Sequence, residues 1–258
     1  EMNISEVLLI KEGNLETNDF VSLTCSFLPI RKTALIGPLD GTITGELTVE
    51  QCFPGRRAFR LVTSSVTTST SIKLNWQENP SSYTDDPNPG YGTHITGVEP
   101  GTSDATPGQD GMNGFDYSPS GNLSLFSFNN AGQSWNAVLN TNATTLTAGE
   151  AYRLMIRGNR SIDITSNAAT PSNTKLRSTG KLVKGPINYN FPLASGEVGF
   201  VGNPFHSMVD MQSILSNATN LSQSFVVWDP NLGGTPVVGQ SGGRGAFVTV
   251  NATINTSN

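Results

Sequence analysis

Charged residues are scarce in this 258-residue chain. Asp, Glu, Lys and Arg together make up 14% of the sequence, whereas soluble domains average about 25%. Long solvated helices carry Glu and Lys on their outer faces, so this scarcity argues against a helical protein. The formal net charge of −5 argues against a nucleic-acid surface, because such a surface needs clustered Lys and Arg.

Long apolar runs and metal-binding side chains are also rare. No apolar stretch reaches the roughly 20 residues that span a bilayer, so we expect no membrane insertion. The two cysteines and two histidines lack the paired spacing of a zinc site. The acids Glu78, Asp116, Glu150 and Asp210 show no spacing that pairs them across a glycosidase cleft. We therefore expect no enzyme and assign no catalytic residues.

The two cysteines lie in segments that have the pattern of neighbouring strands. Every odd position of residues 21–27 is apolar, and residues 46–50 alternate in the same way, which is typical of half-buried strands. If these strands pair, a disulfide between Cys25 and Cys52 would stabilise the chain by about 3 kcal/mol. The alternative is two buried free thiols.

Short strand-like runs separated by Gly, Pro and Asn turns recur along the whole chain, which predicts an all-β fold. In the first fifty residues they recur at about twenty-residue intervals, so we expect short β-solenoid-like or sandwich rungs over residues 1–55. A larger antiparallel, jelly-roll-like β-sandwich is expected over residues 56–258. One short helix is expected near residues 207–216, where Ser207 and Asp210 resemble a capping box.

The stretch from residue 78 to residue 121 is the most loop-like part of the sequence. A loop of this length in a compact domain is either functional or held by contacts outside a core. Ca²⁺ takes six to eight oxygen ligands, and five aspartates lie in this stretch beside Gly and Asn residues, although at no known calcium-motif spacing. Either these aspartates are solvated turn formers, or they bind a Ca²⁺ ion as the only cofactor. The five residues are Asp85, Asp86, Asp104, Asp110 and Asp116.

Aromatic residues suggest a second kind of site. Tyr83 and Tyr91 lie in the polar loop and are candidates for exposed contact with a sugar or another ligand. Residues 71–76 read as a strand in which Ile72 and Trp76 point to the core, because apolar residues alternate there. The tryptophans are therefore expected to be core residues rather than ligand contacts.

Several blocks of the sequence resemble a bacterial protein family. Residues 45–62 (GELTVEQCFPGRRAFRLV), residues 71–78 (SIKLNWQE) and residues 88–97 (NPGYGTHITG) are similar to successive blocks of large surface proteins exported by the type IX secretion system. Later blocks at residues 146–153, 200–205 and 227–230 fit the same order. Gln51 stands where the family pattern often has Arg, and the strand block and C-terminal sorting domain that follow in the family are missing, so we expect a fragment or a processed protein.

The resemblance implies an extracellular or cell-surface location and an adhesive or structural role, without assigned catalytic residues. We expect a non-enzymatic structural or adhesion module whose partners are other protein chains or neighbouring domains, including further copies of itself in a surface fibre. A carbohydrate-binding module of a secreted multidomain protein is the alternative. The arginines of the first block are expected to pair with acids on neighbouring strands. These are Arg56, Arg57 and Arg60, with Glu46, Glu50 or Glu78 as partners.

Overall fold

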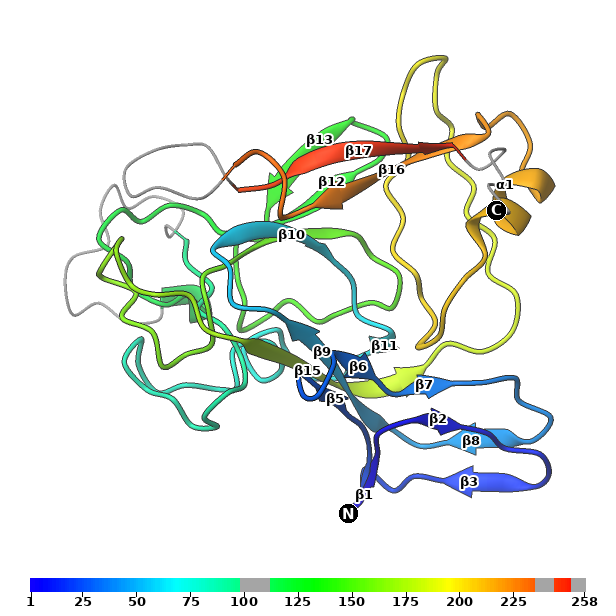
Figure 1. Cartoon of the computed structure of the whole chain (residues 1–258), viewed down its shortest axis with the longest axis horizontal. Helices are drawn as coiled ribbons and strands as arrows, with labels where there is room; N and C mark the ends of the chain where they lie inside the picture. The colour runs from blue at the N-terminus through cyan, green and yellow to red at the C-terminus, as the bar shows by residue number, and fades with distance from the viewer. Residues whose placement is uncertain (98–111, 235–243, 252–258) are drawn as a thin grey trace.

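The computed structural model describes residues 1–97, 112–234 and 244–251, and two main sheets organise these residues (Figure 1). The five-stranded sheet has the order β1 (Met2–Ile4), β4 (Val21–Leu23), β9 (Leu47–Phe53), β15 (Thr174–Leu182), β11 (Val66–Thr67). The four-stranded sheet has the order β10 (Ala58–Val62), β14 (Tyr152–Ile156), β12 (Leu125–Asn129), β13 (Ser134–Ala137).

Four two-stranded pairs complete the strands. They are β2 (Val7–Leu8) with β7 (Leu35–Ile36), β3 (Asn14–Glu16) with β8 (Thr42–Thr44), β5 (Cys25–Ser26) with β6 (Lys32–Thr33), and β16 (Ser224–Asp229) with β17 (Ala246–Asn251). The helical segments among the described residues are a 3-10 turn, η1 (Met112–Gly114), and one α-helix, α1 (Met211–Asn217). The predicted all-β fold with one short helix is confirmed.

The N-terminal strands stack as parallel rungs. β1 pairs with β4, β2 with β7 and β3 with β8, all in parallel, and β4 in turn pairs in parallel with β9. Each rung turns its apolar positions inward, where Leu23, Ile43 and Val49 form a buried cluster. This arrangement is the solenoid-like one that the repeated strand pattern predicts, because a rung buries its apolar face only against the next rung.

β9 joins the rungs to the rest of the molecule. It pairs in parallel with β4 on one side and antiparallel with β15 on the other, where Thr48 lies opposite Thr179. The five-stranded sheet therefore runs without interruption from the first rung into the sandwich. Because β15 arrives in the opposite direction, the parallel stack ends at β9.

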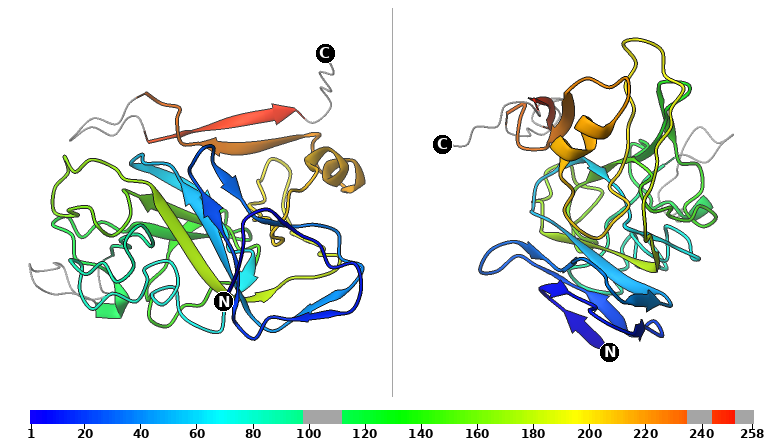
Figure 2. Two further views of the ribbon diagram at one scale, coloured as in Figure 1. Left: turned by 60° about the horizontal axis from the view of Figure 1, so that its bottom comes forward. Right: turned by 90° about the vertical axis from the view of Figure 1, so that its right-hand side faces the viewer.

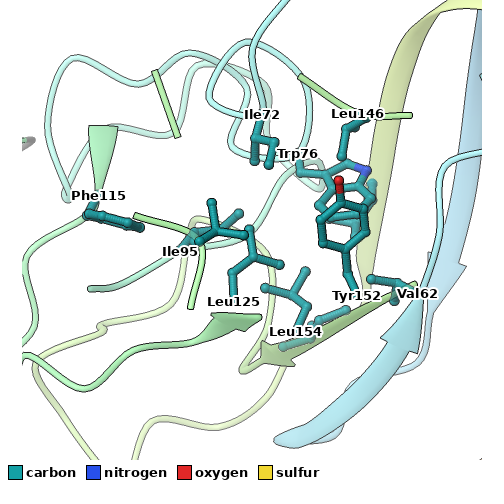
Figure 3. Packing of buried hydrophobic residues seen from close by; sticks show 12 residues of the cluster. Val62, Ile72, Trp76, Ile95, Phe115, Leu125, Leu146, Tyr152 and Leu154 are labelled. Atoms are coloured by element: carbon teal, nitrogen blue, oxygen red, sulfur yellow. The ribbon is translucent and has the colours of Figure 1, made fainter. Parts of the chain in front are cut away.

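A second core fills the sandwich between the two sheets and the loops that cover them (Figure 3). Trp76 is completely buried at its centre, and its ring meets the ring of Tyr152 edge-on at 5.4 Å between centroids. The indole Nε1–H donates to Ser178 Oγ on β15 at 3.0 Å. The indole is thus packed and hydrogen-bonded, as buried tryptophan normally is.

The strand expected at residues 71–76 is wrong, because the chain forms tight turns there. Asn75 N–H donates to Ser71 O, and Gln77 N–H donates to Ile72 O. Ile72 and Trp76 are buried, whereas Leu74 between them is 49% exposed. Apolar residues four positions apart meet on one side of such a turn, and a short run does not distinguish this spacing from strand alternation.

The C-terminal hairpin lies on the far side of the sandwich from the rungs (Figures 1 and 2). The ring of Trp228 on β16 meets the ring of Phe247 on β17 at 4.8 Å. Trp228 and Trp135 are only partly buried, so of the three tryptophans Trp76 alone fits the expected core position fully.

Helix α1 begins later than the sequence pattern suggests. Asp210 is itself the N-cap, and its carboxylate accepts from the N–H groups of Gln212 and Ser213. The Ser207–Asp210 capping box is therefore wrong, because the aspartate fills the position expected for Ser207. In the part of the chain that the structure describes, no helix has the length and apolar character needed to cross a bilayer.

Candidate functional site

The first rung presents an open main-chain edge. Met2 N–H donates to Phe20 O, and Ile4 O accepts from Thr24 N–H, so these two residues bond toward the second rung. Successive residues of a strand point their main-chain groups in opposite directions, which turns the N–H and C=O of Asn3 to the open side. In the described residues, β1 pairs only with β4.

The same alternation continues along β2. Glu6 O and Leu8 O accept from Leu35 N–H and Gly37 N–H of the second rung. The main-chain groups of Val7 therefore face outward like those of Asn3. The open edge is thus not confined to a single strand, because β1, β2 and β3 each have one strand partner among the described residues.

Side chains of the first rung are only partly covered. Ile4 and Leu15 pack on the rung core but stay partly exposed, whereas Leu23 and Ile43, which lie opposite them in the second rung, are buried. Leu8 is partly buried, like Ile36 opposite it. Val7 is 53% exposed. A further layer would complete the burial that the second rung already has.

The opposite end of the stack is closed. β15 covers the free side of β9 over the register from Leu47 to Phe53. The loop around His206 continues this cover, because Ile36 N–H of the second rung donates to His206 O at 2.8 Å. The rung stack therefore has one open end and one covered end.

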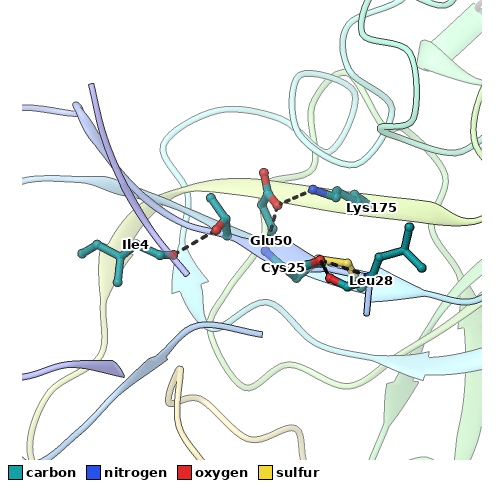
Figure 4. Close-up of a disulfide and its surroundings, with 8 residues drawn as sticks. Ile4, Cys25, Leu28, Glu50 and Lys175 are labelled. Carbon is teal, nitrogen blue, oxygen red and sulfur yellow. Dashed lines mark hydrogen bonds and ion pairs between the residues drawn. A yellow bond between two sulfur atoms is a disulfide. The ribbon is translucent and has the colours of Figure 1, made fainter. Parts of the chain in front are cut away.

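A disulfide fastens the second rung to β9 (Figure 4). Cys25 and Cys52 are bonded, as the alternating strands predict, and the described residues contain no free cysteine. Beside it, the buried carboxylate of Glu50 accepts from Cys25 N–H at 2.9 Å and from Lys175 Nζ at 3.1 Å. The bond and the ion pair together tie the rungs to β15.

Asp116, one of the five candidate calcium ligands, is held by an arginine instead. Both side chains are buried, and Arg160 donates from Nη2 to Oδ1 at 2.7 Å and from Nη1 to Oδ2 at 3.0 Å. Gln77 Nε2 also donates to Oδ2 at 2.9 Å. Arg160 further donates to the carbonyl oxygens of Ser82 and Asp85, so this pair fixes the long polar loop to the sandwich.

The other described aspartates of that loop have separate environments. Asp85 accepts from Ser81 N–H at 2.7 Å and from Ser81 Oγ at 2.8 Å, and these bonds lower the pKa of the Asp85 carboxyl. Asp86 Oδ1 is buried and has no hydrogen-bond partner in the described part of the chain. Asp104 and Asp110 lie outside the described residues. Within the described ranges, His, Cys, Asp and Glu form no group of three that would hold a metal ion.

The two candidate tyrosines both contact other side chains. The ring of Tyr83 lies 5.2 Å from that of Tyr117. Tyr91 lies under the guanidinium of Arg177 at 4.2 Å, and Arg177 is ion-paired with the buried Glu78. Both tyrosines are partly buried. Each ring therefore packs against another side chain and keeps some exposed surface, and its contact with a ligand stays a prediction.

The arginines of the first block do not pair with the expected acids. Arg56 donates to the carbonyl oxygens of Pro230 and Gly234, and Arg60 to that of Pro54. Two of the three acids expected as their partners are held by β15 instead, Glu50 by Lys175 and Glu78 by Arg177. β15 is far away in the sequence, so no local pattern indicated these pairs.

Both histidines are buried and serve as structural links. His94 Nε2 donates to Tyr83 O at 2.9 Å, and burial lowers the pKa of His94. His206 Nδ1 and Ser65 Oγ are 2.7 Å apart, and burial lowers the pKa of His206 to about 4. Among the described residues, neither imidazole lies between an acid and a nucleophile in the manner of a catalytic triad.

A cleft of about 520 Å³ lies between the second rung and the chain that follows β15. Ile36, Leu39 and Phe205 give it an apolar wall, and Lys184 lies at its edge with Nζ donating to Ile43 O. Glu78, Asp116 and Glu150 do not line it. Glu150 instead accepts from the Tyr152 hydroxyl at 2.7 Å.

Comparisons of the chain with protein-family models, with curated proteins and with solved structures found no match. The geometry of the molecule is therefore the basis for any functional proposal.

Proposed function

We propose that this chain is a non-enzymatic structural module of an extracellular or cell-surface protein, and that it ends a stack of parallel β rungs. The observation that carries the proposal is the asymmetry of the stack, which is open beyond β1 and covered by β15 beyond β9. Solenoid proteins need such a terminal unit, because an uncovered rung exposes apolar side chains and main-chain groups.

The partner of the open edge would be a further rung of protein that runs parallel to β1. Asn3 and Val7 offer it outward main-chain groups, and the half-covered Ile4 and Leu15 offer it an apolar surface. Main-chain bonds of this kind give affinity, and the apolar side chains add specificity. The disulfide supports an extracellular location, where such bonds persist. The resemblance to type IX secretion cargo supports the same location.

The test uses the chain with one additional rung. A second copy of residues 1–20 is fused ahead of Glu1, and amide hydrogen exchange is followed by NMR. If the edge accepts a rung, the amides of Asn3 and Val7 exchange fast in the chain alone and are protected in the fusion. A fusion with a scrambled copy of the same twenty residues is the control and should leave both amides unprotected.

A matched substitution separates edge docking from general stabilisation. Asn3→Pro removes an outward N–H without breaking a bond to β4, since edge strands tolerate proline at outward positions. It should abolish protection of Val7 in the fusion, while Asn3→Ala should not. Equal exchange of both amides in the duplicated and scrambled fusions would rule out the proposed docking edge.

A further inference from the structure

Arginine side chains lie close together where β10 begins beside the end of β14. The antiparallel register places Ala58 opposite Ile156. The same register, continued by one residue, brings Arg57, just before β10, opposite Arg157, just after β14, and Arg57 is close enough to act electrostatically on Arg157. Arg244 lies close enough to act electrostatically on both.

The two facing arginines have no acidic partner among the described residues. Arg57 donates to the carbonyl oxygen of Asn167 at 3.0 Å and to its side-chain oxygen at 3.1 Å, which are both neutral acceptors, and its Nε is buried without a partner. Arg157 Nη1 is likewise buried without a partner. The five ion pairs within the described ranges involve neither residue.

This arrangement is unfavourable for the protein by itself. Like charges opposite each other on neighbouring strands destabilise a sheet. A half-buried guanidinium without a counter-ion has also lost water that neutral acceptors such as those of Asn167 replace only in part. Burial, followed by Arg57 and Arg244, lowers the pKa of Arg157 to about 10. Arg157 therefore stays charged at neutral pH.

We infer that Arg57 and Arg157 bind an oxyanion, either a carboxylate or a phosphate or sulfate group. The planar guanidinium presents parallel N–H donors that match such oxygens, and both side chains are partly exposed and so reachable from solvent. This site is separate from the rung edge, because it lies on the four-stranded sheet rather than on β1. It gives an acidic protein of net charge −5 a local means of holding an anionic group.

The test titrates sodium sulfate, sodium phosphate and sodium acetate into the full chain, with NaCl holding the ionic strength constant. Calorimetry gives the melting temperature, and isothermal titration gives the affinity. We expect a saturable rise in melting temperature with at least one of the three. A response to sulfate and phosphate identifies a tetrahedral ligand, and a response to acetate identifies a carboxylate.

Matched variants separate binding from the general stabilising effect of sulfate, which is excluded from protein surfaces and does not saturate. Arg157→Met should weaken oxyanion binding at least tenfold, and in NaCl alone it should melt at the same or a higher temperature because the repulsion is gone. Lys181→Met, which removes an exposed charge on β15, should bind like the unmodified chain. Arg57→Met should behave like Arg157→Met.

Three results would overturn the inference. The first is the absence of a saturable response to all three anions. The second is an equal response in the unmodified chain and in Arg157→Met. The third is a loss of folding or of more than a few degrees of melting temperature in Arg157→Met in NaCl alone, which would mean that the guanidinium already has a stabilising partner within the protein.

Discussion

Arg160 donates two parallel hydrogen bonds to the carboxylate of Asp116, and both side chains are buried. The guanidinium at the same time binds carbonyl oxygens of the polar loop at Ser82 and Asp85. This buried ion pair thus helps to anchor a long connection between the strands. The described part of the polar loop is therefore held both by this ion pair with its hydrogen bonds and by the burial of Ile95 and Phe115 in the sandwich core.

Removing one partner of this pair should destabilise the protein strongly. Asp116→Asn leaves the Arg160 charge buried and uncompensated, and broken buried pairs of this kind cost about 3–5 kcal/mol. Urea denaturation followed by tryptophan fluorescence measures the loss. The exposed pair of Lys11 and Asp40, with both side chains about two-thirds exposed, is the control. Asp40→Asn should change stability by less than about 1 kcal/mol, and equal effects of the two substitutions would contradict the assigned role.

The bond between Cys25 and Cys52 should contribute about 3 kcal/mol, since it closes a loop across a sequence separation of 27. The double substitution Cys25→Ala with Cys52→Ala should lower the free energy of unfolding by that amount. Thiol titration of the unreduced, denatured chain should find no free thiol. Two titratable thiols would show that the bond is absent from the protein as purified.

Acid should weaken the protein through His206. Its pKa is about 4 in the folded protein and about 6.5 when unfolded, so the unfolded chain binds the extra proton between these values. The resulting stability is complete above about pH 6.5 and is lost as the pH falls toward 4, by about 3 kcal/mol in all. His206→Gln should flatten the unfolding free energy over this window. An unchanged slope in the variant would exclude His206 as the cause.

The hydrogen bond from Trp76 to Ser178 links the sandwich core to β15. A double-mutant cycle measures its contribution to the free energy of unfolding. Trp76→Phe leaves the Ser178 hydroxyl without its donor, which we expect to cost about 1–3 kcal/mol together with the lost volume. Ser178→Ala should cost less by itself. The coupling free energy from the cycle should be about 1 kcal/mol. Strict additivity of the two substitutions would show that this bond does not contribute.

Self-association through the rung edge should stop at two copies. Because β15 covers the other end of the stack, two chains meet only with their first rungs facing each other. Sedimentation velocity at increasing concentration should show nothing larger than a dimer, and Asn3→Pro should favour the monomer. Long fibres that survive Asn3→Pro would mean that assembly uses a second surface elsewhere on the molecule.

The sequence predicted the features that depend on short-range periodicity, namely the strands and their stacking. Alternation around Cys25 and before Cys52 predicted neighbouring strands that a disulfide could join, and the repeated runs indicated stacked rungs. The disulfide is present, although Cys25 lies on β5, which pairs with β6, and it is the preceding strand β4 that pairs with β9. Alternation was misleading at residues 71–76, where a turn buries Ile72 and Trp76 equally well. Arg160 and Arg177, which hold Asp116 and Glu78, lie 44 and 99 residues from them. No local pattern connects such distant residues, so their pairing becomes visible only when the sandwich is formed.

The two strands that flank β9 also indicate the order in which its contacts form during folding. Its contact with β4 joins residues about 26 positions apart, as Ser22 and Thr48 show, whereas its contact with β15 spans 131 positions between Thr48 and Thr179. Closing the shorter loop costs less chain entropy, and contacts near in sequence form earlier in most small domains. β9 is thus available as a template before β15 arrives, and until then its free side is as vulnerable to mispairing with another molecule as any exposed strand.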